Sequence, residues 1–207
     1  MKKNKQFALL VAGGLLLFLF SCSPAPDKHT ETSFYTLDDF TQVPKIDAHV
    51  HIRTYDSSFA HQAKNDNFRL LSIVVEEEPG IAIQQQYAIA QKKSFPETVA
   101  FATTFSLEGF NSDSWLTQTI DGLQQSVDHG AIAVKIYKNI GMELKAPEGN
   151  MVMVDDQQFN PVWDFLVKKH IPVIGHLGEP KNCWLPVDQM TIRSDKRYYS
   201  RHPEFHM

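Results

Sequence analysis

The strongest candidates for chemistry are two histidines, His49 and His51, which end a short apolar run. Alternate residues of a strand project to the same side, so both imidazoles are able to bind one metal ion. Asp47 lies on the same face, one step deeper, where its carboxylate can orient a ligand. Surface histidines are the commoner explanation of such a short motif taken alone. Its position after a predicted buried strand favours the metal site.

A third histidine, His176, follows a second apolar run in the last quarter of the chain. Parallel α/β folds place their sites at the carboxyl ends of the strands. We therefore expect His176 to join the site, although a histidine bonded to loop backbone is the alternative. Glu179, three residues further on, is a candidate to orient His176 or to contact substrate.

Two other groups near these strand ends are candidates for substrate contact. Arg53 is able to clamp a carboxylate through two hydrogen bonds, or it is a solvated loop arginine. Of the three acids at 76–78 one is able to face the site, although three acids in a row are usually solvated. Cys183 has no predicted base beside it, so we expect a buried, unreactive thiol.

The elements that must position these residues alternate between apolar runs and helix-period segments. Runs rich in Val, Ile and Phe predict strands at 45–52, 68–75, 99–105, 131–137 and 171–175. Helices are predicted between them, and their apolar faces are Ile83, Tyr87 and Ala90; Leu116, Ile120, Leu123 and Val127; and Phe159, Val162, Trp163 and Leu166. Ser112 is the predicted N-cap of the second helix, Gly130 its stop, and Asp155-Asp156 the start of the third. Such alternation predicts a parallel sheet.

The number of strands leaves the architecture open at this stage. A (β/α)₈ barrel takes about 250 residues, whereas a doubly wound domain of five strands fits 207 residues better. Composition does not distinguish between the two folds. The residues at the strand ends do.

The strand-end motifs together resemble the amidohydrolase superfamily, in its amidohydrolase-related branch of metal-dependent hydrolases and decarboxylases. The resemblance runs from about Pro44 to the carboxyl terminus and rests on the segments 46–51, 133–138 and 172–176. It implies an α/β fold that forms an incomplete TIM (β/α)₈ barrel, about the first five units, over residues 44–207. The chain is then expected to be a carboxyl-terminally truncated fragment, inactive by itself.

The resemblance also implies roles for individual residues. His49, His51 and His176 match metal ligands, for zinc or alternatively manganese. Lys135 matches a strand-end lysine that contacts substrate in some members and is carboxylated and bridges two metals in others; packing at the barrel rim is the bland alternative. The family's histidine after strand 6 and aspartate after strand 8 have no counterpart, and His202 and His206 are assigned no ligand role.

The reaction implied is hydrolysis of an amide, cyclic amide or lactone by water that the metal activates. Two alternatives stay open, a metal-dependent non-oxidative decarboxylase and a non-catalytic surface lipoprotein. In either enzyme the partner is a small-molecule substrate. The formal net charge is −4, without a Lys/Arg cluster, which argues against nucleic acid as a partner.

The amino terminus predicts export and lipidation. A cationic start and an apolar stretch at 7–20 are typical of a secretory signal, and Leu19-Phe20-Ser21-Cys22 resembles the lipobox of bacterial lipoproteins. An ordinary signal peptide with a chance cysteine is the alternative. We thus expect a signal over 1–22, a lipid anchor on Cys22, a tether over 23–43 and a location at the bacterial cell envelope, on the periplasmic or outer-membrane surface.

Overall fold

A computed structural model describes residues 34–176 and 178–206 of the chain. The predicted signal, Cys22 and most of the predicted tether lie outside these residues. The chain divides into the units Met1–Leu37 and Asp38–Met207, and the second contains the sheet and its helices. In the described ranges no helix is long and apolar enough to cross a membrane.

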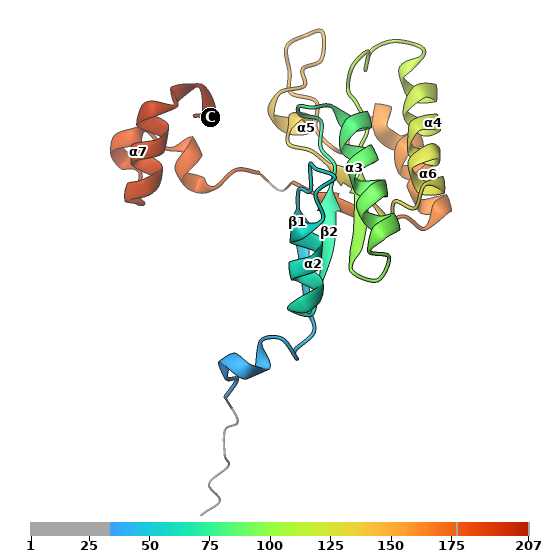
Figure 1. Cartoon of the computed structure of the whole chain (residues 1–207). Helices are drawn as coiled ribbons and strands as arrows, with labels where there is room; N and C mark the ends of the chain where they lie inside the picture. The colour runs from blue at the N-terminus through green and yellow to red at the C-terminus, as the bar shows by residue number, and fades with distance from the viewer. Residues whose placement is uncertain (1–33, 177, 207) are drawn as a thin grey trace, which may run out of the picture. The chain divides into compact units, whose positions relative to one another are not determined.

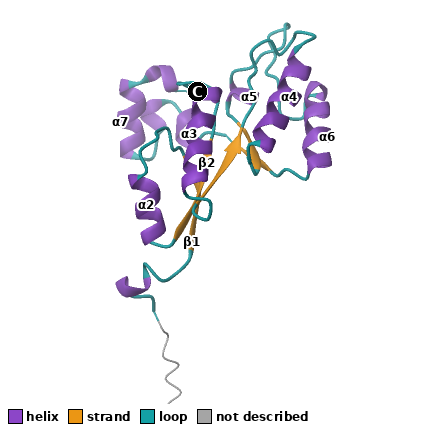
Figure 2. Cartoon of the chain, turned by 45° about the vertical axis from the view of Figure 1, so that its right-hand side comes forward, coloured by secondary structure: helices purple, strands orange, loops and turns teal. Residues whose placement is uncertain are grey.

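The core of the second unit is a curled, five-stranded parallel sheet in the order β1-β2-β3-β4-β5 (Figure 2). Its strands are β1 (Lys45–Val50), β2 (Phe68–Ile73), β3 (Val99–Thr103), β4 (Ala133–Ile136) and β5 (Val173–Gly175). Each strand lies inside its predicted range, so the five predicted strands and the parallel α/β class are confirmed. A doubly wound sheet reverses its strand order at a switch point, and this sheet does not.

The helices are α2 (Ser58–Asn65), α3 (Ile81–Ser94), α4 (Trp115–Asp128), the short α5 (Asn139–Met142), α6 (Asn160–Lys169) and α7 (Arg193–Arg201). The helices α2, α3, α4 and α6 pack against the sheet, whereas α7 packs against the short turns of its own segment (Figure 1). Val134 and Ile136 of β4 pack with side chains of α4 and α6 in the largest apolar cluster. Ala133, on the other face of β4, packs instead with Ile73, Val75 and Ala102. The second face is therefore the concave one, away from the helices.

The helix α3 is where predicted, but the prediction of its buried face was wrong. We expected Ile83, Tyr87 and Ala90 to face inwards, whereas Gln84, Ala88 and Gln91 are the buried residues. Ile83 is instead 41% exposed.

Backbone groups of the loops explain this choice of face. The Gln84 amide donates to the carbonyls of Val75 and Glu77 at 2.9 and 2.8 Å, and accepts from the Val75 N–H at 3.2 Å. Gln91 donates to two carbonyls of the loop after β1. Since buried backbone groups must be paired, satisfying these groups outweighs burial of one isoleucine.

The third predicted helix, α6, has the expected apolar face, with Phe159, Val162 and Leu166 buried. In α4 the buried residues are Trp115, Thr119, Leu123 and Ser126, so of the predicted face only Leu123 is fully buried, while Leu116 and Ile120 pack partly buried against the same cluster.

The helix α4 begins at Trp115, not after Ser112, because the buried indole donates to the Ser106 carbonyl at 2.8 Å and anchors the first turn. Gly130 follows α4 with φ +94°, as a helix stop requires. Asp156 accepts from Gln158 N–H ahead of α6, where the predicted start lies.

The segment after β5 contains an unpredicted helix, α7, among the short 3₁₀ turns Lys181–Trp184, Val187–Gln189 and Pro203–Phe205. A further short 3₁₀ turn, Leu37–Asp39, precedes β1, and Gln157–Phe159 precedes α6. Periodicity missed α7 because it has no buried residue. Cys183 is buried as predicted, with its Sγ 2.9 Å from the Tyr199 hydroxyl.

Candidate functional site

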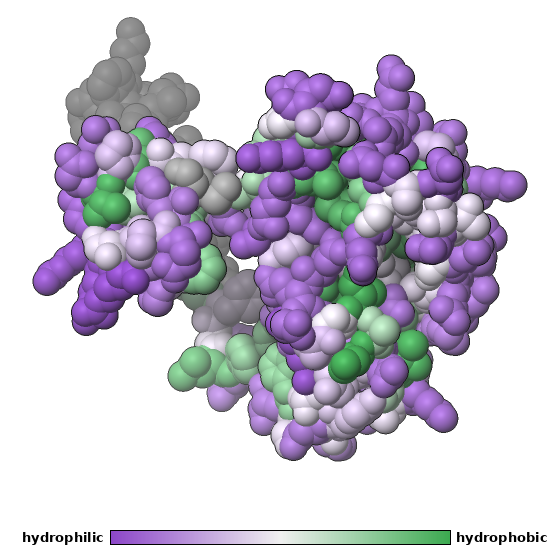
Figure 3. Space-filling view, turned by 90° about the horizontal axis from the view of Figure 1, so that it is seen from above, coloured by the Kyte–Doolittle hydropathy of each residue, from purple (hydrophilic) through white to green (hydrophobic). Residues whose placement is uncertain are grey.

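One cavity of about 450 Å³ lies at the carboxyl ends of the strands. Six residues expected at the site line it, namely His49, His51, Arg53, Lys135, His176 and Glu179. The cavity is also lined by Val75, Glu77, Tyr137 and Lys138. Seen from above, hydrophilic side chains surround apolar ones in the middle of the body that contains the sheet (Figure 3).

The two histidines of the first strand end lie as their spacing predicted. Their ring centroids are 5.3 Å apart, and the rings meet edge to face. The Asp47 carboxylate accepts the backbone N–H of His49 at 3.1 Å and is not among the residues that line the cavity. Asp47 therefore orients the backbone that carries His49 and not the ring itself.

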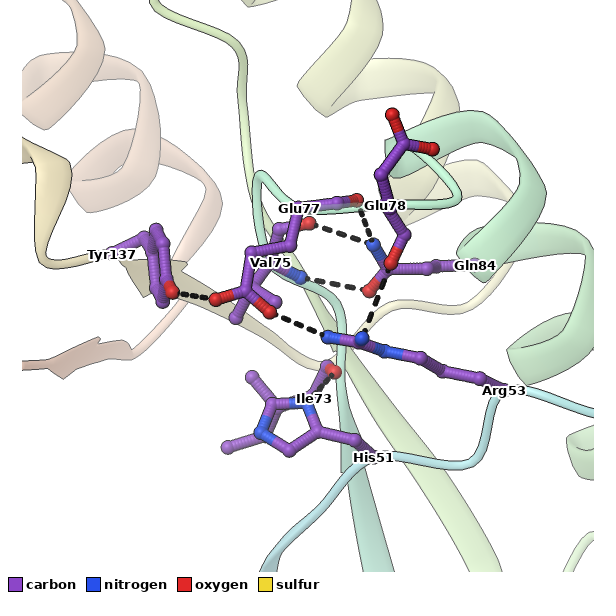
Figure 4. A network of polar contacts seen from close by, with 8 residues as sticks. All are labelled: His51, Arg53, Ile73, Val75, Glu77, Glu78, Gln84 and Tyr137. Atoms are coloured by element: carbon purple, nitrogen blue, oxygen red, sulfur yellow. Dashed lines mark hydrogen bonds and ion pairs between the residues drawn. The ribbon is translucent and has the colours of Figure 1, made fainter. Parts of the chain in front are cut away.

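The imidazole of His51 is held in one orientation by the neighbouring strand. Its Nδ1 lies 2.8 Å from the Ile73 carbonyl oxygen (Figure 4). Because a carbonyl only accepts, Nδ1 carries the hydrogen and Nε2 keeps its lone pair when the ring is neutral. Burial lowers the pKa of His51 and favours that neutral form.

His176 has a buried ring nitrogen with no hydrogen-bond partner among residues 34–176 and 178–206. Its Nε2 is enclosed, and the nearest carboxylate oxygen, on Glu179, is 3.6 Å away, which is too long for a hydrogen bond. Burial lowers the pKa of His176, with Glu179 acting in the opposite direction. An unpaired buried polar atom is costly unless a ligand completes it. The environment thus fits a neutral nitrogen awaiting a bound group.

Lys135 points from β4 into the cavity with only 2% of the residue exposed. The described part of the chain shows no hydrogen bond or ion pair to its ammonium group. Burial lowers the pKa of Lys135, since the charged form loses hydration that nothing replaces. A buried cation without a counter-ion is typical of a functional site.

We expect Lys135→Met to stabilise the fold near neutral pH, because it removes the cost of burying the charge. The melting temperature should rise by about 2–4 °C, the shift for roughly 1 kcal/mol in a chain of this size. The folded pKa lies below the unfolded one, so the cost is complete below the folded pKa, shrinks as pH rises between the two pKa values and is gone above the unfolded pKa. The gain should thus shrink at alkaline pH in thermal unfolding experiments, and the exposed-lysine control Lys64→Met should show no gain. An equal gain at both pH values would contradict the assignment.

Arg53 is already engaged by its neighbours. Its guanidinium donates to Glu77 Oε2 at 3.0 Å and to the Glu78 carbonyl at 3.1 Å (Figure 4). Tyr137 donates its hydroxyl to the other oxygen of Glu77. The hydrogen bond from Tyr137 and the charge of Arg53 lower the pKa of Glu77, whereas burial and Glu77 raise the pKa of Tyr137. A substrate would bind those N–H groups of the Arg53 guanidinium that do not donate to Glu77 or Glu78.

The three consecutive acids have different roles. Glu77 lines the cavity, whereas Glu76 binds the loops after β3 and β4. Its carboxylate accepts from the Leu107 N–H at 2.9 Å and from the side chains of Ser106 and Asn139. Glu76 therefore fixes the rim, and Glu77 is the acid that faces the site.

Sequence reasoning missed Tyr137 and Lys138 as cavity residues. Tyr137 lies two positions after Lys135, so strand alternation places both on the concave face. Lys138 pairs with Glu179 at 3.6 Å across the cavity rim. Only spatial proximity of the two strand ends identifies that pair.

The donor chemistry of the cavity fits a borderline divalent metal such as zinc, since neutral imidazole nitrogens are its usual ligands. The unpaired Nε2 of His176 is the observation that supports this fit. Within residues 34–176 and 178–206 no three His, Cys, Asp or Glu side chains are gathered around one metal position.

A comparison of the chain with known protein families, curated proteins and solved structures found no significant match.

Proposed function

We propose that the chain carries the strand-end site of a metal-dependent hydrolase built on a (β/α)₈ barrel, of which the five β/α units form part. The reaction is hydrolysis of an amide, cyclic amide or lactone. One observation carries the proposal. Histidines from β1 and from the end of β5, the two outer strands of the sheet, line one cavity with a buried lysine, and His176 Nε2 is buried without a partner.

In this proposal His49, His51 and His176 hold the metal. A bound divalent ion supplies Lewis acidity, which polarises a carbonyl and lowers the pKa of water. Ile73 fixes the ring of His51, and Asp47 fixes the backbone of His49. Lys135 offers a cation to charge that develops on substrate oxygen.

A decarboxylase is the second candidate, and the state of Lys135 favours it. A buried ammonium without a counter-ion suits a substrate carboxylate, and Lys138 lies at the same cavity. In that reaction the cavity would hold the carboxylate until carbon dioxide leaves. The two activities differ in their products and not in their binding groups.

The test starts from purified chain loaded with zinc or manganese. We expect about one equivalent of metal by mass spectrometry after dialysis, and metal-dependent release of a new acid from an amide and lactone panel. Turnover should be low, because the described part of the sheet has five strands and the aspartate implied after an eighth is not among them. Labelled carbon dioxide from carboxylated substrates would favour the decarboxylase. A folded chain that binds no metal would favour the non-catalytic lipoprotein and overturn the proposal.

We also propose that the protein is a lipoprotein anchored through Cys22 at the cell envelope. The lipobox-like residues at 19–22 support it. Metabolic labelling with a radioactive fatty acid should mark wild type and leave Cys22→Ser unlabelled. Equal labelling of the two proteins would contradict lipidation at this residue.

A further inference from the structure

The helix α7 presents three arginines on one exposed face. Arg193, Arg197 and Arg201 follow a four-residue spacing, which places them within one side of a helix. All three are exposed, and the described residues include no hydrogen bond or ion pair to any of their guanidinium groups. With Ser194, Tyr198 and His202 they line a hollow of about 510 Å³.

The opposite side of α7 attaches the helix to the rest of its own segment. Asp195 accepts from Asn182 at 2.9 Å, and Lys196 Nζ donates to the Asp188 carbonyl at 2.8 Å. Tyr199 contacts the buried Cys183 on the same side. These contacts fix the rotation of the helix, so the arginine face is directed away from the surface on which α7 packs.

Aromatic rings lie beside the arginines. The ring of Tyr198 is 4.7 Å from that of His202 and stacks with Phe205 at 6.3 Å. Tyr198 is 47% exposed and Phe205 55% exposed, so these aromatic rings are in contact with solvent. The surface of this segment shows hydrophilic side chains next to hydrophobic patches (Figure 3). Amphipathic rings beside cations are typical of surfaces that meet lipid headgroups.

We propose that the arginine face of α7 binds the headgroups of anionic phospholipids. Guanidinium groups pair with phosphate through several donors, and the three span about 12 Å, the length of eight helical rises. Nucleic acid is the weaker match, because three arginines on a helix of nine residues make a small footprint for a long polyanion, whereas the exposed rings of Tyr198 and Phe205 suit a lipid interface. The proposed anchor at Cys22 would hold the chain at a membrane, and the arginine face would add an electrostatic contact with its headgroups.

The test uses the full chain with Cys22→Ser, so that no acyl chain contributes. Its partition coefficient is measured by vesicle flotation with phosphatidylcholine alone and with added phosphatidylglycerol. The ratio of the two coefficients removes the apolar contribution of the amino terminus. Since each basic residue near an anionic surface contributes about fivefold, the variant Arg193→Gln/Arg197→Gln/Arg201→Gln should lower the ratio by roughly a hundredfold.

The matched control removes three exposed lysines elsewhere, as Lys64→Gln/Lys93→Gln/Lys168→Gln, for the same change in net charge. It should lower the ratio far less, and circular dichroism should show all proteins folded. Equal losses in both variants would mean that net charge alone acts and would overturn the proposal. So would an unchanged ratio in the arginine variant, or tighter binding of single-stranded DNA than of anionic vesicles. None of these results depends on metal binding or on lipidation.

Discussion

His176→Ala is expected to lower the zinc affinity of the chain by more than a hundredfold. The substitution removes a nitrogen that is buried and has no hydrogen-bond partner in the described part of the chain, and it leaves two of the three proposed ligands, both from one strand end. Loss of an outer partner of a metal ligand typically costs about 10–100-fold, and loss of a ligand costs more. Competition titration with a chromogenic chelator measures the affinity, and mass spectrometry measures the metal content after dialysis.

Two matched variants locate the effect. His129→Ala removes an exposed histidine after α4, outside the cavity, and should leave the zinc affinity unchanged. Asp47→Ala should cost about 10–100-fold, since Asp47 binds the backbone of His49 and not the ion. If His176→Ala kept the zinc content of wild type, His176 would not be a ligand. The proposal that β1 and β5 together supply the metal site would then be wrong.

The sequence predicts the site well where strand alternation alone decides it. His49 and His51 share a face because they are two apart. The same rule relates Tyr137 to Lys135 and could have identified Tyr137, which we did not predict. Apolar runs identified all five strands, but only β2, β3 and β4 contain buried residues. In β1 and β5, which were predicted to be buried, every residue is intermediate or exposed. That His176 lines the same cavity as the first strand end depends on how the sheet curls, and periodicity carries no information on that.

The hydrophobicity pattern did not predict which polar side chains are buried. In α3 a hydrophobicity pattern selects Ile83, while the loops require Gln84 and Gln91 for their backbone groups. The same limit applies to Glu77, which is identical in type to its two neighbours. Its role becomes visible only when Arg53 and Tyr137 are placed on either side of it.

The cavity residues on the concave face are held with different firmness, according to how close their strand lies to the edge of the sheet. Lys135 of β4 lies on that face, and its carbonyl accepts the Thr104 hydroxyl of the loop after β3 at 2.8 Å, so the sheet itself holds it. His176 is less constrained, because β5 is three residues long and pairs only with β4 among the described strands. Its N–H donates to the Ile136 carbonyl at 3.2 Å. A change in the position of β5 is therefore expected to move His176 more than Lys135.

The 207-residue chain, made as written, is expected to self-associate and to be poorly soluble. In the described sheet β1 and β5 each have one strand neighbour, and unpaired edges act as templates for other chains. Both edges carry exposed apolar side chains, Ile46 at 67% and Val173 at 48%. Val173 also borders an apolar hollow of about 510 Å³ that Trp163 and Ile171 line. Size-exclusion chromatography should show large species at low salt and high salt alike.

Charges placed on the two edges should reverse this behaviour. Lysine on an edge strand opposes pairing, so Ile46→Lys/Val173→Lys should raise the monomer fraction several-fold. The control Ile83→Lys/Ile192→Lys adds the same charge at isoleucines that are 41% and 52% exposed and lie outside the sheet. It should leave the monomer fraction close to wild type. A wild-type chain that is a monodisperse monomer would contradict the prediction, because it would show that β1 and β5 do not pair with other chains. Amide hydrolysis by that monomer would show in addition that β5 is held opposite β1.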